Sequence, residues 1–464
     1  MSVQASDKKP SQGKDMTLKP KPFLCALAMA GAMLGLAGCS VADQIGNLNP
    51  FNRSEDVMPG ERRSVLATTG DALAGASLSG SGASISATVA LSDWSQPGGN
   101  AANAPGNVSL SGGDGALLWR AQTSAKVGRK GVRASAPPLA VGGRYYVYDA
   151  GGTVTALAGA GGRQWSVSLK PEGENSLTTG GGIAAAGNVI VAATGYGEMV
   201  ALDAASGGRA WTYELREPAR GAPTAAGGKV YVVTTSNVLH AVNIADGSQA
   251  WTYAGIPESA GVLSAASPAV SGNIVVVPYT SGEVIAFDAA TGQPKWSDSV
   301  IRAVRTSAVS GLSDVSASPV ISDGVVFATG VSGRTIAVRL SNGERLWEEN
   351  IGSAYTPAVS GNAVFLLDLD DNLVAINRAN GKAFWSTRLP VVRKKRFFSV
   401  WAGPTLAGNA LWAVSNDGRL ISVEPATGQI LSDRKLPGPA FIKPTAAGGR
   451  LYVLAGDGSL SALR

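Results

Sequence analysis

The hydrophobic positions of this chain fall in short runs, each ended by glycine, asparagine, aspartate or serine. In the segment 267–296 the apolar runs AVS, IVVV and EVIAF are separated by polar turns, and a last turn leads into PKW. Alternation with a period of two and β-branched residues between turn signals are typical of β-strands. The segment therefore predicts four short strands joined by tight turns.

The same phrase recurs along the chain and ends each time on a glycine followed four residues later by a tryptophan. We expect each tryptophan to cover the edge between its own sheet and the next one, because a large flat side chain buries much apolar area there. A further copy carries Ser432 in place of the tryptophan. The seven tryptophans that share this offset are Trp119, Trp165, Trp211, Trp251, Trp296, Trp347 and Trp385.

Counting the repeats gives seven complete units and one divided unit. The last copy, residues 443–464, contains only three strands, and residues 114–123 supply the missing fourth with Trp119. Arrays of such four-stranded units are typical of β-propellers. The chain lacks the Gly-His and Trp-Asp pairs of WD40 blades and the helical period of TPR or HEAT repeats. We predict an all-β, eight-bladed propeller over residues 107–464, with four-stranded antiparallel blades and an N-terminal strand paired with the C-terminal blade.

The N-terminus has the pattern of a targeting segment. Lys19 and Lys21 precede an apolar stretch that ends in Leu36-Ala37-Gly38-Cys39, which resembles the cleavage box of bacterial lipoproteins. Residues 1–38 are therefore predicted to be a lipoprotein signal peptide with Cys39 as the lipidation site. Met16 is an alternative start, with residues 1–15 as an upstream extension, and an ordinary signal peptide with an incidental cysteine is the other interpretation. Cys25 would be removed, so no intramolecular disulfide is expected.

Residues 39–106 are predicted to be the lipidated cysteine and a flexible tether. The segment is rich in glycine, alanine and serine without a sustained period. About 65 flexible residues have a reach on the order of 45 Å. Two pieces, PGERRSVLA near Pro59 and DWSQPGGN around Trp94, are candidates for local order, since the indole of Trp94 would be costly to leave in water.

Composition and charge add few constraints. Sixty glycines and an aromatic content of 6% suit a β protein with many turns. Of the 39 basic and 33 acidic side chains, five and two lie in residues 1–38, which leaves a formal charge of +3 for the rest. This near-neutral balance does not indicate nucleic-acid binding.

Few residues suit catalysis. His240 is the only histidine, which excludes a zinc site with several histidines, and its place in an alternating strand favours a structural role. Asp203, Asp288 and Glu424 share one repeat position before the turn glycine, where side-chain to backbone bonds explain an acidic residue. We predict no catalytic residue, no metal and no cofactor.

Three segments interrupt the repeat spacing, at residues 256–265, 300–316 and 390–401. Each connects a tryptophan strand to the next blade, and in a propeller such crossovers share one face, so we expect a common binding patch. The run from Arg393 to Phe398 could contact an anionic membrane surface, an acidic partner or nucleic acid, or be a solvated loop. The candidate partner-binding residues are Val262, Leu263, Arg302, Arg305, Leu312, Asp314, Arg393 and Arg396.

The phrase AFDAATGQPKW resembles the repeat of pyrroloquinoline-quinone (PQQ) dehydrogenase propellers. Together with Leu36 to Cys39 and a body of bare blades, the chain resembles the BamB family, lipoproteins of the outer-membrane β-barrel assembly machinery. That resemblance implies lipid anchoring at the outer membrane, with Ser40 after Cys39 suiting this destination. It also implies a periplasmic body that is monomeric within a complex. Its role would be that of a non-enzymatic scaffold that binds the POTRA domains of BamA and other assembly-machinery subunits.

Leu312-Ser313-Asp314-Val315 resembles a family segment implicated in BamA contact, whereas residues 256–265 are apolar where family members present an arginine. The alternative is a PQQ-dependent dehydrogenase-like or other ligand-binding periplasmic propeller. Quinoprotein dehydrogenases characteristically carry a vicinal cysteine pair. The processed chain would keep only Cys39, which argues against PQQ.

Overall fold

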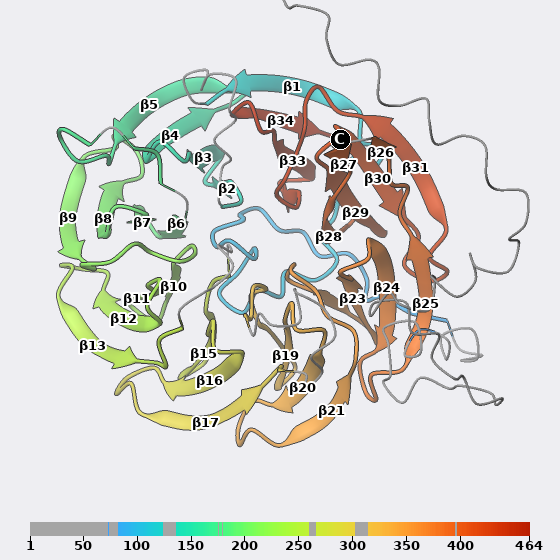
Figure 1. The fold of residues 1–464 in the computed structure, drawn as a ribbon. Helices are drawn as coiled ribbons and strands as arrows, with labels where there is room; N and C mark the ends of the chain where they lie inside the picture. Colours follow the sequence, from blue (N-terminus) through green and yellow to red (C-terminus); the bar gives the residue numbers. More distant parts are fainter. Residues whose placement is uncertain are drawn as a thin grey trace, which may run out of the picture. The chain divides into compact units, whose positions relative to one another are not determined.

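The chain folds as a ring of four-stranded sheets around a central axis (Figure 1). The computed structural model describes residue 73 and residues 82–123, 136–174, 176–178, 180–258, 266–301, 314–394 and 397–464. All of them belong to the larger of two compact units, residues 65–464. Within the described residues no helix has the length and apolar character needed to cross a membrane.

The predicted eight blades of antiparallel strands are confirmed. Blade 1 contains β2 (Leu139–Val141), β3 (Arg144–Tyr148), β4 (Thr153–Ala158) and β5 (Gly162–Ser168), and blade 2 contains β6 (Gly181–Ala186), β7 (Val189–Thr194), β8 (Glu198–Asp203) and β9 (Arg209–Glu214). Blade 3 contains β10 (Thr224–Ala226), β11 (Lys229–Val233), β12 (Val238–Asn243) and β13 (Gln249–Ala254), and blade 4 contains β14 (Ala269–Ser271), β15 (Ile274–Pro278), β16 (Glu283–Asp288) and β17 (Pro294–Ser299).

The second half of the ring repeats this arrangement. Blade 5 contains β18 (Val320–Ser322), β19 (Val325–Thr329), β20 (Thr335–Arg339) and β21 (Arg345–Glu349), and blade 6 contains β22 (Ala358–Ser360), β23 (Ala363–Leu367), β24 (Asn372–Asn377) and β25 (Ala383–Arg388). Blade 7 contains β28 (Trp401–Ala407), β29 (Ala410–Ser415), β30 (Arg419–Val423) and β31 (Ile430–Lys435). The short strands β26 (Arg393–Lys394) and β27 (Phe397–Phe398) form a separate hairpin between blades 6 and 7.

Blade 8 closes the ring by joining the two ends of the propeller sequence, as predicted. Its strand order is β1 (Leu117–Gln122), β34 (Ser459–Leu463), β33 (Arg450–Leu454) and β32 (Thr445–Ala447). The outer pair is held by main-chain bonds and by an ion pair between Arg120 and Asp457. At the seam with blade 1, the hydroxyl of Tyr452 donates to that of Tyr145 over 3.1 Å.

The repeated tryptophans lie between neighbouring blades. The indole N–H of Trp296 in blade 4 donates to the carbonyl of Leu340 in blade 5 over 2.7 Å, and its ring faces Gly343. A Cβ at Gly343 would lie 2.6 Å from that of Trp296, and φ there is +76°, so both the space and the backbone require glycine. The same bond to the next blade is made by Trp165, Trp211, Trp251, Trp347 and Trp385.

The boundary between blades 7 and 8 uses a different solution. Blade 7 has Ser432 at the tryptophan position, and its hydroxyl lies 2.6 Å from that of Ser422. The ring of Trp412, from the second strand of the same blade, faces Gly115 instead. An aromatic ring against the turn glycine is thus retained although the side chain comes from another strand.

The prediction of a flexible tether is wrong for residues 82–106, because they fold into the body. Residues 39–81 lie outside the described residues except for residue 73. We call residues 82–111 the axial strap, drawn in blue at the centre of Figure 1. Trp94 within it is buried, which confirms the expectation that DWSQPGGN is ordered. Each blade shares at least one hydrogen bond with the strap, through Ala140, Ala185, Ala225, Val270, Ile321, Asn362, Leu406 and Gly449.

The strap binds the blades at one end of the ring. Its partners lie at or beside the turn between the first and second strands of each blade. Gln96 shows how it links neighbours: its Nε2 donates to Ala185 O in blade 2 over 2.8 Å, and its Oε1 accepts from Ala225 N in blade 3 over 2.9 Å. The strap therefore bridges the blades across the axis at the face that carries these turns.

Replacing Trp296 with alanine should lower the free energy of unfolding by about 3–5 kcal/mol, because a buried indole and its interblade hydrogen bond are lost. Urea unfolding followed by circular dichroism measures this. Lys295→Ala, next to it on the outer strand, is the control and should change stability little. A loss no larger than that of the control would contradict the interblade role of the tryptophan.

Replacing Gln96 with alanine should cost about 1–3 kcal/mol, because buried main-chain groups in blades 2 and 3 lose their partner. Hydrogen exchange should show faster exchange of the Ala225 amide. Gln164→Ala, an exposed position on β5, serves as the control. Unchanged protection at Ala225 would mean that the strap does not hold these blades.

Candidate interaction face

All crossovers between blades emerge on one face, opposite the axial strap. Each blade is an antiparallel meander, so its first-to-second and third-to-fourth turns lie at one end of the strands. The second-to-third turns and the crossovers then lie at the other end. We call this second end the crossover face. The three segments that interrupt the repeat all join the body there, entering blades 4, 5 and 7.

Most of the sequence-predicted binding residues belong to segments outside the described residues. These residues and Cys39 are absent from the described ranges: Val262, Leu263, Arg302, Arg305, Leu312 and Arg396. Arg393 belongs to β26, whose backbone is described, while its side chain is not. These assignments stay predictions.

Asp314 is not a surface contact, which corrects the expectation from the sequence. Its side chain is 1% exposed and forms an ion pair with Arg220, which is 3% exposed. Arg220 also donates from Nη1 to Pro278 O over 2.9 Å and from Nη2 to Val315 O over 2.8 Å. Because a buried carboxylate needs a compensating charge, this aspartate is held inside the ring and is not available to a partner.

Arg220 is the residue that sequence reasoning missed. It lies in the crossover into blade 3, far in sequence from Asp314, and stands where other copies of the repeat have Ala265 and Ser316. A charged residue at a position that is uncharged in the other copies of the repeat was the available signal. Burial lowers the pKa of Arg220, and the Asp314 carboxylate opposes this shift.

The connection between blades 4 and 5 is fixed at both of its ends. Before the gap in the described residues, Val300 N donates to Gly282 O over 3.0 Å, and Ser332 Oγ donates to Val300 O over 2.6 Å. After it, Val315 N donates to Tyr279 O over 3.2 Å. The connection between blades 3 and 4 is fixed where it begins, since Asn237 Nδ2 donates to Ile256 O over 2.6 Å. Both crossovers therefore start on hydrogen-bonded supports, and the one between blades 4 and 5 also ends on one.

Exposed apolar side chains gather on the crossover face. Ile256 is 56% exposed and Ile301 is 41% exposed, at the start of the two neighbouring crossovers. Six of the eleven large apolar side chains exposed among the described residues lie on this face: Leu177, Ile256, Ile301, Leu369, Val392 and Val400. Exposed apolar groups concentrated on one face are a feature of protein interaction surfaces.

The enzyme-like features have structural explanations. The Tyr213 hydroxyl lies 3.1 Å from His240 Nδ1 and donates to Gln249 Oε1 over 2.8 Å, and burial lowers the pKa of His240. Asp203 accepts from Ser206 Oγ over 2.7 Å and from Ser206 N over 2.8 Å, and these bonds brace its turn and lower the pKa of its carboxyl. Asp288 and Glu424 brace their turns in the same way. Among the described residues no group of three or more acidic, histidine or cysteine side chains is placed to hold a metal ion.

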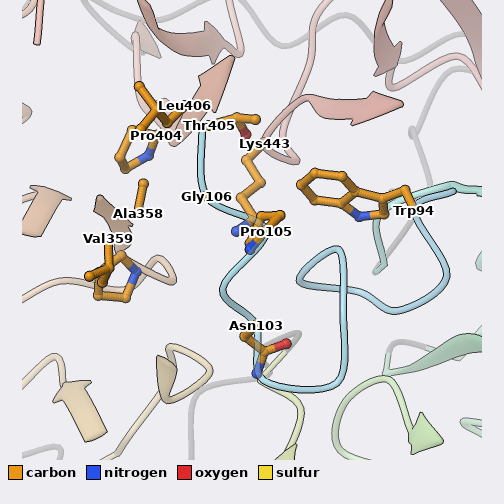
Figure 2. Close-up of a pocket in the computed structure, with 11 residues that line it drawn as sticks. Trp94, Asn103, Pro105, Gly106, Ala358, Val359, Pro404, Thr405, Leu406 and Lys443 are labelled. Atoms are coloured by element: carbon orange, nitrogen blue, oxygen red, sulfur yellow. The ribbon is translucent and has the colours of Figure 1, made fainter. Parts of the chain in front are cut away.

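A pocket lies between the strap and blades 6 to 8 (Figure 2). Lys443 lines it together with Trp94, Pro105 and Leu406, and burial lowers the pKa of Lys443 to about 8. The lining is mainly apolar, and the strap itself supplies one wall. This pocket offers a single cation and no acid, so it is not a constellation for general acid–base chemistry.

Comparison with known proteins decides the family. The sequence model of the family described as outer membrane protein assembly factor BamB matches residues 101–174, 150–387 and 390–464. The chain belongs to this family. The BamB of Escherichia coli K12 is 32% identical over 214 residues, which is 45% of this chain and 54% of that protein. The chain spans about half the length of the curated BamB relatives it matches.

Solved structures show the same fold. The crystal structure of BamB from Moraxella catarrhalis superposes with a TM-score of 0.62 at 23% identity and covers 74% of this chain and 99% of that one. The quinohemoprotein alcohol dehydrogenase from Comamonas testosteroni superposes with a TM-score of 0.63 at 16% identity and covers 80% of each chain. Likeness at this level of identity shows the propeller fold, which BamB proteins share with such dehydrogenases.

Replacing Arg220 with methionine should destabilise the body by about 3–5 kcal/mol, because Asp314 is left buried without its partner. The double variant Arg220→Met/Asp314→Leu should recover much of that loss, since no unpaired charge remains. Chemical unfolding of the two single variants and the double variant gives the coupling energy. Strictly additive losses would contradict a direct buried pair.

Proposed function

We propose that this chain is a non-enzymatic scaffold lipoprotein of the outer-membrane β-barrel assembly machinery. In this role the crossover face binds the periplasmic POTRA domains of BamA, and lipid on Cys39 anchors the chain at the outer membrane with its body in the periplasm. Other assembly subunits bind within the same complex. The match of almost the whole propeller to the BamB family carries the proposal.

The geometry of the crossover face supports a docking role. Ile256 and Ile301 are exposed on neighbouring crossovers whose supports are held by Asn237, Gly282 and Ser332. Preformed supports reduce the entropy lost on binding, and exposed aliphatic groups supply anchors. Val262, Leu263, Arg302, Arg305 and Leu312 extend these crossovers in sequence and are proposed to complete the contact. Asp314 is assigned a supporting role through Arg220 in place of direct contact.

A quinone-dependent dehydrogenase is less well supported. The fold is common to both kinds of protein, so it does not favour either one. The axial strap crosses the ring at one end and binds every blade, which leaves little of the axis free on that side. The conclusion therefore stays with the scaffold.

Replacing both Ile256 and Ile301 with aspartate should reduce co-purification of BamA at least about tenfold, because two apolar anchors become charged groups that resist burial. The melting temperature should not change, since both side chains are exposed. Leu346→Asp/Leu431→Asp, at equally exposed positions on outer strands, is the matched control and should bind like the wild type. Undiminished co-purification by the Ile256/Ile301 variant would contradict docking through this face.

A further inference from the structure

One position of the inner strands lies where neighbouring blades meet close to the axis. It is four residues before the last residue of the first strand of each blade, the strand nearest the centre in Figure 1. In blades 4 and 5 the hydroxyls of Ser267 and Ser318 lie 3.1 Å apart there, and Ser318 N donates to Thr356 Oγ1 in blade 6 over 3.2 Å. We call the residues at this position the inner ring. From blade 1 to blade 8 they are Pro137, Gly182, Ala222, Ser267, Ser318, Thr356, Gly403 and Lys443.

Lys443 is the exception within the inner ring. The other members are uncharged and small, which lets neighbouring blades approach closely: a Cβ at Gly182 would lie 2.5 Å from that of Ala222 in blade 3. In blade 7 the neighbour of Lys443 is Gly403, which has no side chain. Lys443 lines the pocket between the strap and blades 6 to 8 together with Pro105 of the strap (Figure 2). A long cationic side chain is therefore present where the other blades carry small neutral groups.

The amine of Lys443 has no ionic partner within the residues that the structure describes. It takes part in none of the ion pairs found there, and the pocket lining contains no carboxylate. Burial lowers the pKa of Lys443 to about 8, and no neighbouring carboxylate opposes this shift. The buried Arg220 differs in this respect, because Asp314 pairs with it. A charged amine removed from water without a counter-charge is costly, so a bound anion would stabilise the protonated form of Lys443.

The other side-chain donors of the pocket are already engaged. Asn103 Nδ2 donates to the main-chain carbonyls that precede β14 and β18, over 3.4 and 3.0 Å. Thr405 Oγ1 donates to a main-chain carbonyl of blade 8 over 2.6 Å, and the indole N–H of Trp94 donates to a carbonyl within the strap over 3.4 Å. Asn103 Oδ1 lacks a partner among the described residues and lies beside Gly98 of the strap. Lys443 is therefore the side-chain donor that the pocket lining offers to a ligand.

The size and the walls of the pocket define the class of ligand. Its empty space measures about 280 Å³, part of it open to solvent, which is below the roughly 300–1,000 Å³ of pockets for drug-sized ligands. Lys443 is half-buried, so a ligand can reach its side chain. Pro105, Val359 and Leu406 form apolar walls that suit a short alkyl group. A dianion would bring a second charge that no side chain of the lining balances. A compact monovalent carboxylate fits these conditions.

We propose that this pocket binds a small monovalent carboxylate, of the size of acetate, whose charge pairs with the amine of Lys443. The carboxylate supplies the counter-charge that the described side chains do not provide, and its alkyl group contacts the apolar walls. The ligand thereby links blade 8 to the strap and to blades 6 and 7, which line the same pocket. A ligand that binds the folded chain and not the unfolded one stabilises the fold by mass action. This inference does not depend on the scaffold role.

Thermal unfolding of the full chain tests the proposal, with sodium acetate replacing sodium chloride at constant ionic strength and pH 7. The melting temperature of the wild type should rise with acetate and reach a plateau. Lys443→Met should abolish this rise and, in chloride, should be at least as stable as the wild type, because an unpaired charge is removed. Lys443→Arg should keep the rise, since it keeps the cation. Lys382→Met, which removes an exposed cation between β24 and β25, is the control and should behave like the wild type.

Calorimetric titration of the wild type with acetate gives a second readout. Only the protonated amine attracts the carboxylate, and Lys443 is the ionisable side chain of the pocket lining. The affinity should therefore fall about tenfold between pH 7 and pH 9, as the pH rises through the pKa of about 8.

Three results would overturn the proposal: equal melting temperatures of the wild type in acetate and chloride, a wild-type rise in Lys443→Met, or an affinity that is the same at pH 7 and pH 9. The second of these would assign the acetate effect to another part of the chain. None of these measurements involves BamA, so failure of the scaffold role is recognised separately, with the Ile256/Ile301 variant.

Discussion

Contact between an indole ring and the turn glycine of the next blade determines the architecture of this protein. Each such contact packs a large side chain on a glycine with positive φ. At six of the boundaries the indole also donates a hydrogen bond to the next blade. Repeated around the ring, it sets the distance between sheets and keeps their inner strands close to the axis. At the boundary of blades 7 and 8 the tryptophan position carries Ser432, and Trp412 from another strand places its ring against the turn glycine. The contact between ring and glycine is therefore kept, whichever strand supplies the ring.

The axial strap adds a second constraint that acts across the ring. Blade-to-blade contacts are local, whereas the strap joins all eight blades through one continuous segment. The N-terminal part of the body is therefore held in the fold at two places, by the strap and by the pairing of β1 in blade 8. The strap covers the end of the ring that carries the turns between first and second strands. The crossover face is the opposite end, and it carries the connections of variable length. Rigid supports and variable connections are the combination that suits recognition.

The fold could be predicted from the sequence because the repeat is defined by local signals. Turn glycines, short alternating runs and the tryptophan offset each act over a few residues, and their repetition gives the number of blades and the composite closure. The strap escaped prediction because its bonds join residues that are far apart in the sequence, and many of them use main-chain groups, which leave no pattern in the sequence. Only Trp94 indicated burial. The pairing of Arg220 with Asp314 joins residues 94 positions apart. Only their three-dimensional placement shows that Asp314 faces inward and that Ile256 and Ile301 are exposed on the crossover face.

The central claim is that a closed, strap-braced ring presents its crossover face to the assembly machinery. Site-specific photo-crosslinking in intact cell envelopes tests it most directly, with the photoreactive residue placed at position 301 on the crossover face or at position 228 in a turn of the opposite face. The account predicts an adduct with BamA from position 301 and none from position 228. An adduct from position 228 with none from position 301 would contradict it.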